Sequence, residues 1–268
     1  MNPVPLTSSQ WAAAMVLAIS EQLTERKRNA WIYQSGKCLF KLRRSQAHLS
    51  NIDAIYADIE AINPEQFPVK IGVVKGRPIE ELFYSYYDGP LAQDLFFNVD
   101  GFFEAAKSCI DFSLAMLGSA GVLKNPPNSM NAIIKDLKRH RRHSGDPIAD
   151  ALLSMWQRAG RPVKEYRDCF THFVALAGDH WQTAINIKCE SGVTHARLFL
   201  PDNPSANRNA SFTYEQCIDA RMLIEELVAS LEKYVNDTLS IAAAKRGIKD
   251  GLPVKLSKTQ HSVAVGLW

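Results

Sequence analysis

The first part of the chain shows apolar residues at helical spacing. They recur every four positions after Ser8 and Ser9, either of which can cap a helix: Trp11, Met15, Ile19 and Leu23. We expect this first helix to end in the polar run at 25–29. The aromatic segment Ala30–Gln34 then predicts a short strand.

A second helix is predicted from about Lys37 to Asn63, because apolar residues repeat there at spacings of three and four. Pro64 ends it, since proline cannot continue a helix interior. Between Pro64 and Gly89 the period changes to an alternation of apolar and polar positions, and Leu82–Tyr87 is a second aromatic run. The segment therefore predicts a small sheet of two or three strands.

The middle of the chain predicts four further helical segments. Asp100–Gly118 has a strong apolar face and a glycine stop, and Ser129–Leu137 is a short helix. Asp146 followed by Pro147 is an N-cap with proline in the first turn, and it opens a helix that we expect to end at Gly160. Pro162 opens the next helix, which runs to about Ala177.

The last third predicts a hairpin and a long helix. Ile185, Ile187 and Cys189 alternate with polar residues, and Thr194–Leu200 returns as the partner strand. We expect the final helix to run from Thr213 to Arg246, with Gln216 completing a capping box.

These elements together define the expected fold. It is an α+β fold, mostly α, with a helical bundle at its centre and a small β-sheet and hairpin as decorations. We expect N-terminal helices and a small sheet over residues 1–89, packed on a bundle over residues 90–246 that carries the hairpin as an insertion. Residues 247–268 form a C-terminal tail without a clear period.

Composition excludes several classes of protein. Hydrophobic residues make up 46% and charged residues 22% of the 268 positions, which is ordinary globular usage. No apolar stretch approaches the roughly 20 residues of a spanning helix, so we expect no membrane segment. The N-terminus has no Lys or Arg before its apolar centre, so a signal peptide is not expected. The five cysteines are widely spaced and predict buried thiols in a reducing, cytoplasmic setting.

The chain is nearly neutral, with 31 Lys and Arg and 28 Asp and Glu. Any nucleic-acid binding would therefore need a local patch of positive charge. The sequence candidate is the basic segment from Lys135 to His143, with its cations at Lys138, Arg139, Arg141 and Arg142. The alternative interpretation is a solvated helix end, where cations favour the negative end of the helix dipole.

The most informative chemistry is an Arg and a His five residues apart on one predicted helix, Arg167 and His172. Val163, Tyr166 and Phe170 mark the core side of that helix, so His172 is expected to project nearly opposite. Asp168 lies four residues before His172, and its carboxylate can fix the imidazole tautomer and raise the imidazole pKa. A permanent guanidinium fork beside a general acid or base suits metal-independent phosphodiester chemistry. The alternative is a surface Arg in an ion pair and a solvated His.

The segment from Arg167 to His172 resembles the motif of the HEPN superfamily of helical-bundle proteins, which is Arg, a polar residue, three further residues and His. Phe102–Phe112 is similar to the long early helix of that bundle, and the resemblance covers roughly Asp100 to Arg246. It implies a homodimer in which two motifs face each other and cut RNA through 2′-hydroxyl attack. His172 would then transfer protons, Arg167 would hold the phosphate, and Asp168 would orient the pair.

Other sites are weaker in this sequence. It contains no GxSxG element and no phosphate-binding glycine loop, so we expect no cofactor. Asp179, His180 and His195 are isolated polar residues near strand ends, and we expect no metal site. The first hypothesis is thus a cytoplasmic HEPN-type endoribonuclease, in a toxin or defence role. The rival hypothesis is a non-catalytic helical module that dimerises or binds a partner.

Overall fold

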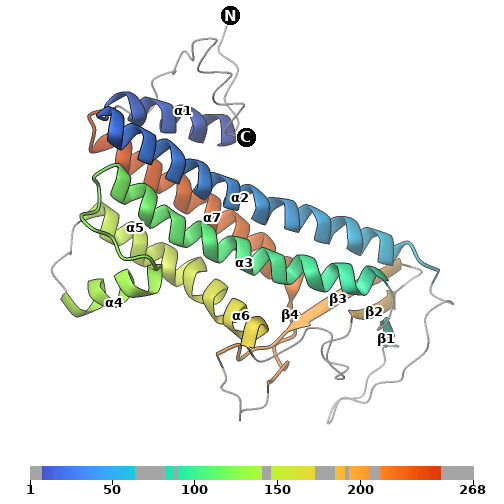
Figure 1. Cartoon of the computed structure of the whole chain (residues 1–268). Helices are drawn as coiled ribbons and strands as arrows, with labels where there is room; N and C mark the ends of the chain where they lie inside the picture. The colour runs from blue at the N-terminus through green and yellow to red at the C-terminus, as the bar shows by residue number, and fades with distance from the viewer. Residues whose placement is uncertain are drawn as a thin grey trace, which may run out of the picture. The chain divides into compact units, whose positions relative to one another are not determined.

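The fold is described by a computed structural model that covers residues 8–63, 83–86, 90–140, 146–172, 185–190, 193–205 and 212–248. For a few positions inside these elements, His172 among them, the backbone alone is described. Within these ranges the chain is mostly helical with a small antiparallel sheet, which confirms the predicted α+β class (Figure 1).

Seven α-helices are present among the described residues. Their bounds are α1 Ser8–Glu21, α2 Glu25–Glu60, α3 Pro90–Ser119, α4 Met130–His140, α5 Pro147–Met155, α6 Arg161–His172 and α7 Ala220–Ala244. A π-helical segment, Trp156–Gly160, joins α5 to α6. No described helix is both long enough and apolar enough to cross a bilayer.

The sheet contains four described strands in the order β1-β2-β3-β4, and every neighbouring pair is antiparallel. Their bounds are β1 Phe83–Tyr86, β2 Ile185–Glu190, β3 Val193–Leu200 and β4 Ile218–Asp219. Ile187 pairs with Ala196 in the β2–β3 hairpin, which confirms the predicted hairpin, and alternate residues of β3 are buried. The polar alternate Asn186 of β2 is buried as well. Residues 64–82 of the predicted N-terminal sheet lie outside the described residues.

The described residues divide into two compact units. Unit 1 contains the described residues of 8–43, 106–161 and 229–248, and unit 2 contains those of 44–105 and 162–228. In unit 1, Trp31 Nε1 of α2 donates to the carbonyl of Val16 in α1 across 2.8 Å. The buried hydroxyls of Ser113 in α3 and Tyr234 in α7 lie 2.7 Å apart, so these helix segments share one core.

In unit 2, α2 supplies hydrogen-bond acceptors to the sheet. Tyr56 Oη accepts from the backbone N–H of Leu198 across 3.1 Å, and Glu60 Oε1 accepts from the N–H of Ala196 across 3.0 Å. Because buried backbone N–H groups need partners, these two side chains fix β3 against the end of α2. Asp53 of α2 forms an ion pair with Arg221 at the start of α7.

Two predictions at the start of α2 are wrong. The polar run at 25–29 begins a helix rather than ending one, and Ala30–Gln34 is helical rather than a strand. Trp31, Ser35 and Cys38 are fully buried at helical spacing, so tertiary packing overrides the strand preference of the aromatic run.

Three predicted helix ends are also wrong. α3 begins ten residues earlier than Asp100, at Pro90. Gly160 ends no helix, because the π-helical segment continues the chain into α6, whereas Asp146 is the N-cap of α5 as predicted. α7 begins at Ala220 and not at Thr213, since Asp219 accepts hydrogen bonds from the N–H groups of the first turn.

Candidate functional site

The packing of α6 on α3 positions the predicted motif. Val163 and Tyr166 of the predicted core side are buried and Phe170 is half-buried, so the structure confirms that side in part. Cys169, which was not predicted there, is buried as well, and Val174 and Ala177, which continue the same helical spacing, lie outside the described residues. Phe103 of α3 contacts the rings of Tyr166 and Phe170, with centroids 5.3 and 5.4 Å apart. Burial of these rings holds the motif-bearing helix against α3.

Tyr166 also ties α6 to the segment after β3. Its hydroxyl donates to the carbonyl of Pro201 across 2.9 Å in a buried position. Burial raises the pKa of Tyr166, and Asp202 adds to that rise. The phenol therefore stays protonated as a structural donor at neutral pH.

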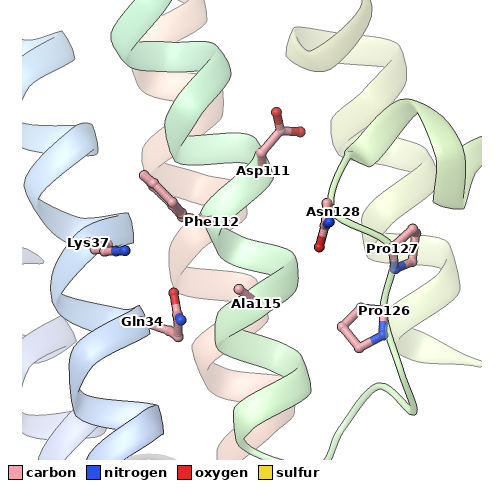
Figure 2. A pocket seen from close by; sticks show the side chains of 8 residues that line it. All are labelled: Gln34, Lys37, Asp111, Phe112, Ala115, Pro126, Pro127 and Asn128. Atoms are coloured by element: carbon pink, nitrogen blue, oxygen red, sulfur yellow. The ribbon is translucent and has the colours of Figure 1, made fainter.

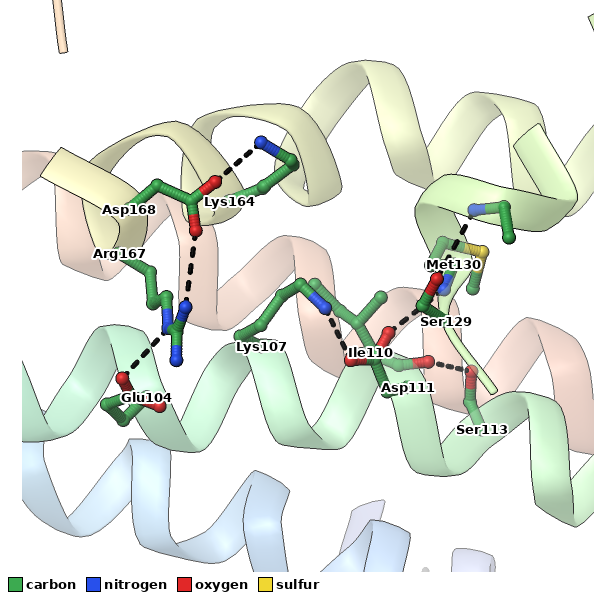
Figure 3. A network of polar contacts seen from close by, with 11 residues as sticks. Glu104, Lys107, Ile110, Asp111, Ser113, Ser129, Met130, Lys164, Arg167 and Asp168 are labelled. Atoms are coloured by element: carbon green, nitrogen blue, oxygen red, sulfur yellow. Dashed lines mark hydrogen bonds and ion pairs between the residues drawn. The ribbon is translucent and has the colours of Figure 1, made fainter. Parts of the chain in front are cut away.

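Arg167 is half-buried on α6, and 32% of its side chain is exposed. Its Nε donates to Glu104 Oε1 of α3 across 2.8 Å, and Nη1 donates to Asp168 Oδ1 across 3.3 Å (Figure 3). Nη2 has no hydrogen-bond partner among the described residues. Burial alone would lower the pKa of the guanidinium, but the two carboxylates outweigh it and raise that pKa.

Asp168 is held from the preceding turn of its own helix. Lys164 Nζ donates to Asp168 Oδ2 across 2.6 Å, while Arg167 engages the other oxygen (Figure 3). Burial would raise the pKa of Asp168, but the hydrogen bonds and charges of Lys164 and Arg167 prevail and lower it. The carboxylate is thus ionised well below neutral pH, as an orienting group must be.

His172 is the last residue of α6, and its side chain lies outside the described residues. The contact expected between Asp168 and His172 therefore stays a prediction. The backbone does place both residues on one helix, four positions apart, which is the spacing that makes side chains neighbours.

Glu104 belongs to the candidate site, although no sequence motif pointed to it. It accepts from Arg167 Nε, and Thr171 Oγ1 lies 3.5 Å from the same oxygen. The available signal was its position in α3: Glu104 follows buried Phe102 and Phe103 and precedes buried Ala105 and Ala106. An acidic residue inside such an apolar run is a candidate partner for a cation on a neighbouring helix.

Further polar groups of unit 2 extend from Glu104 along α3 towards α2. Asp100 lies one turn before Glu104. Burial is the main cause that raises the pKa of Asp100, and the charge of Glu104 adds to it. The charges of Arg167 and His48 lower this pKa by a smaller amount. His48 Nδ1 lies 3.0 Å from Asn98 Oδ1. Gly101 allows this approach, since a Cβ there would lie 2.6 Å from the His48 ring.

The predicted basic segment is described in part. Lys138 and Arg139 are exposed near the end of α4, whereas Arg141 and Arg142 lie outside the described residues. Both the nucleic-acid interpretation and the solvated helix end agree with this exposure, so the role of these four cations stays a prediction.

Among the described residues, no three His, Cys, Asp or Glu side chains gather as metal ligands. His195 is exposed on β3, and Asp179 and His180 lie outside the described residues.

The cysteines agree with the prediction in part. Cys38, Cys109 and Cys169 are buried, so Cys169 is a packing residue of α6. Burial raises the pKa of its thiol to about 12. Cys217 is exposed, contrary to the prediction of a buried thiol, because it sits in the turn before β4 with a left-handed backbone. The side chain of Cys189 is outside the described part.

Comparisons of the chain with protein-family models, with curated proteins and with solved structures found no match.

Proposed function

We propose that this protein is a metal-independent endoribonuclease of HEPN type, whose site contains Arg167, His172 and Asp168. The observation that carries the proposal is the state of Arg167. Its guanidinium is anchored at Nε by Glu104 and is partly exposed. Nη2 of Arg167 lacks a hydrogen-bond partner among the described residues. Arg167 also lies five residues before His172 on the same helix.

Such an arginine suits a phosphate. A planar guanidinium held at one nitrogen presents its remaining donors in a fixed direction, which favours two-point contact with phosphate oxygens. The contact with Asp168 is long at 3.3 Å and partly exposed. Ion pairs of this kind contribute at most about 1 kcal/mol, so a phosphate oxygen can replace Asp168 at Nη1.

The proposed reaction needs no group from outside the protein and the RNA. The ribose 2′-hydroxyl loses its proton to a base and attacks the adjacent phosphorus, and the bond to the 5′-oxygen breaks as that oxygen takes up a proton. The products are a 2′,3′-cyclic phosphate and a 5′-hydroxyl. His172 takes part in the proton transfers, and Arg167 stabilises charge on the phosphoryl oxygens.

The proposal includes a homodimer, because a site on the outer side of one helix needs a second wall to exclude water. It also includes a cytoplasmic location, which the cysteine usage predicts, and a toxin or defence role, which follows from the resemblance of the motif. A helical protein that cuts RNA without a metal would need no cofactor for such a role.

A second candidate function is a non-catalytic binding module. The ion pairs of Arg167 with Glu104 and Asp168 favour it, since both carboxylates already neutralise the cation in the isolated chain. In that case the motif stabilises α6 against α3 and takes no part in chemistry.

An RNA-cleavage assay in EDTA separates the two. Under the nuclease proposal, Arg167→Ala and His172→Ala each lower the cleavage rate at least about a hundredfold, the scale of one charge-stabilising or proton-transfer group. Arg158→Ala and His195→Ala are matched controls, because both residues are exposed elsewhere in the described chain. Equal rates for His172→Ala and the parent would rule out the nuclease.

A further inference from the structure

The larger part of α2 is basic in sequence. Residues 26–52 contain seven Lys and Arg and no Asp or Glu, whereas the rest of the chain has 24 Lys and Arg against 28 Asp and Glu. The near-neutral total therefore hides a concentrated basic helix. A stretch of this kind attracts a polyanion whatever the net charge of the protein.

Two exposed aromatic residues lie among these cations. Tyr33 is 60% exposed and Phe40 is 61% exposed, although large apolar rings are normally buried. With Lys37 and Lys41 they occupy positions i, i+4, i+7 and i+8, which lie on one side of a helix. We call these four residues the α2 face.

Lys37 joins the α2 face to a second ring. Its Nζ lies 4.2 Å from the centroid of Tyr33 and 5.2 Å from that of Phe112 in α3. Aromatic rings beside cations are the combination that single-stranded nucleic acids use, with bases stacked on the rings and phosphates near the cations.

A groove of about 390 Å³ adjoins this face within unit 1. Figure 2 shows it between α2 and the segment 126–128, with α3 as its floor. Its lining residues are Gln34, Lys37, Asp111, Phe112, Ala115, Pro126, Pro127 and Asn128. Gln34 and Asn128 bring amide donors and acceptors, which can bond the edge of a base.

The one carboxylate in the groove lining is already engaged. Asp111 pairs with Lys107 on the same helix and accepts from the backbone N–H of Met130 across 2.9 Å (Figure 3). Because Lys107 balances Asp111, Lys37 supplies the uncompensated charge of the groove.

We propose that the α2 face and this groove bind single-stranded RNA. Tyr33 and Phe40 stack bases, Lys37 and Lys41 contact phosphates, and the groove takes one base against Phe112. The choice of RNA as ligand rests on the proposed nuclease function. What is new is the place at which the nuclease would hold its RNA strand.

Two other occupants fit the surface less well. A helix that lies in a membrane surface needs a broad apolar stripe, and the α2 face has two rings between cations. A second copy of this chain would bring the same basic residues against each other in a twofold contact, which like charges oppose.

Binding to a 12-nucleotide 2′-O-methyl oligouridylate tests the inference, since this strand cannot be cut by 2′-hydroxyl attack. We expect Tyr33→Ala and Phe40→Ala in the full chain each to weaken binding about tenfold, as for the loss of one stacked base. Lys37→Gln should lower the salt slope, log Kd against log salt, by about 0.7. Tyr33→Phe should bind like the parent.

Phe97→Ala and Lys233→Gln are the matched controls, because Phe97 is 71% exposed on α3 and the Lys233 side chain is 63% exposed on α7. Photocrosslinking of 5-bromouridine RNA should label peptides that contain Tyr33, Phe40 or Phe112. Parental affinity for Tyr33→Ala and Phe40→Ala would overturn the inference. So would binding to phosphatidylserine vesicles, and not to RNA, that depends on these rings.

The nuclease proposal and this inference fail separately. If the protein cuts RNA and the α2 variants bind and cut like the parent, the nuclease proposal holds and RNA binding by the α2 face is ruled out. If no RNA is cut but binding depends on Tyr33, Lys37 and Phe40, the α2 face stands and the nuclease does not.

Discussion

Glu104 of α3 accepts a hydrogen bond from Arg167 Nε across 2.8 Å, so a residue 63 positions away anchors the arginine of the motif. The anchor leaves the outer part of the guanidinium towards solvent. It also makes Glu104 a positioning residue for the proposed phosphate contact.

Glu104→Gln should lower RNA cleavage about tenfold with little loss of stability. An amide still accepts from Nε, but it no longer holds the guanidinium by charge, so the donors are less well aligned. The pair is partly exposed, and its loss should change the free energy of unfolding by less than about 1 kcal/mol. Urea unfolding and cleavage rates measure the two effects.

The matched control for this change is Glu225→Gln, which alters an exposed carboxylate near Arg221 on α7. It should leave cleavage unchanged. A Glu104→Gln protein that cuts RNA at the parental rate would remove Glu104 from the positioning role.

Asp168→Asn should destabilise the protein at neutral pH and lose that effect in acid. Lys164 and Arg167 hold the pKa of the folded carboxyl below its usual value of about 3.9, despite the opposing effect of burial. The stabilisation is therefore complete above about pH 4 and disappears as pH falls through the lowered pKa.

Urea unfolding of the parent and Asp168→Asn at several pH values checks this sign. At pH 7 the variant should be less stable by up to about 1 kcal/mol, and the difference should shrink as pH falls below about 4. A difference that grows on acidification would contradict the ion pairs described for Asp168.

Tyr56→Phe should destabilise unit 2 by about 1–3 kcal/mol, the cost of leaving a buried N–H without an acceptor. Tyr56 is 1% exposed and Leu198 is buried, so water cannot replace the lost hydroxyl. Tyr33→Phe is the control, since it removes an exposed hydroxyl. Equal stabilities for Tyr56→Phe and the parent would mean that β3 does not depend on α2.

The protein should be a dimer at the concentrations at which it cuts RNA. The proposed site needs a second subunit to cover Arg167 and His172, and the α2 face should stay outside that contact. Sedimentation velocity across the active concentration range measures the mass. A monomer that cuts RNA at full rate would contradict the two-subunit site.

The sequence predicted the class of fold because its periodic signals are long. The β2–β3 hairpin and the Asp146–Pro147 cap of α5 both depend on neighbours in the chain, and both are confirmed. The strand predicted at Ala30–Gln34 failed because Trp31 is buried against α1, and no local pattern reports a partner helix.

The prediction that a helix ends at Gly160 failed for a related reason. Glycine often ends helices, but here a Cβ would lie 2.7 Å from the Trp156 ring, so the residue makes room for packing within the π-helical segment. Spacing alone could not separate these two uses of glycine.

The residues of the candidate site on α6 could be predicted from the sequence, whereas their partner on α3 could not. Arg167 and Asp168 share a helix and were found by spacing, whereas Glu104 reaches Arg167 through the packing of Phe103 on Tyr166. Charge counted over the whole chain also concealed the basic residues of α2, because the total includes the acidic remainder.

The most direct test is cleavage of an RNA in which one nucleotide, 5′ to a mapped cut, lacks its 2′-hydroxyl. With EDTA present, the parent protein should leave a 2′,3′-cyclic phosphate at every cut in the unmodified strand and should not cut after the 2′-deoxy position. Cleavage that continues there at an unchanged rate would contradict the proposed chemistry of Arg167 and His172.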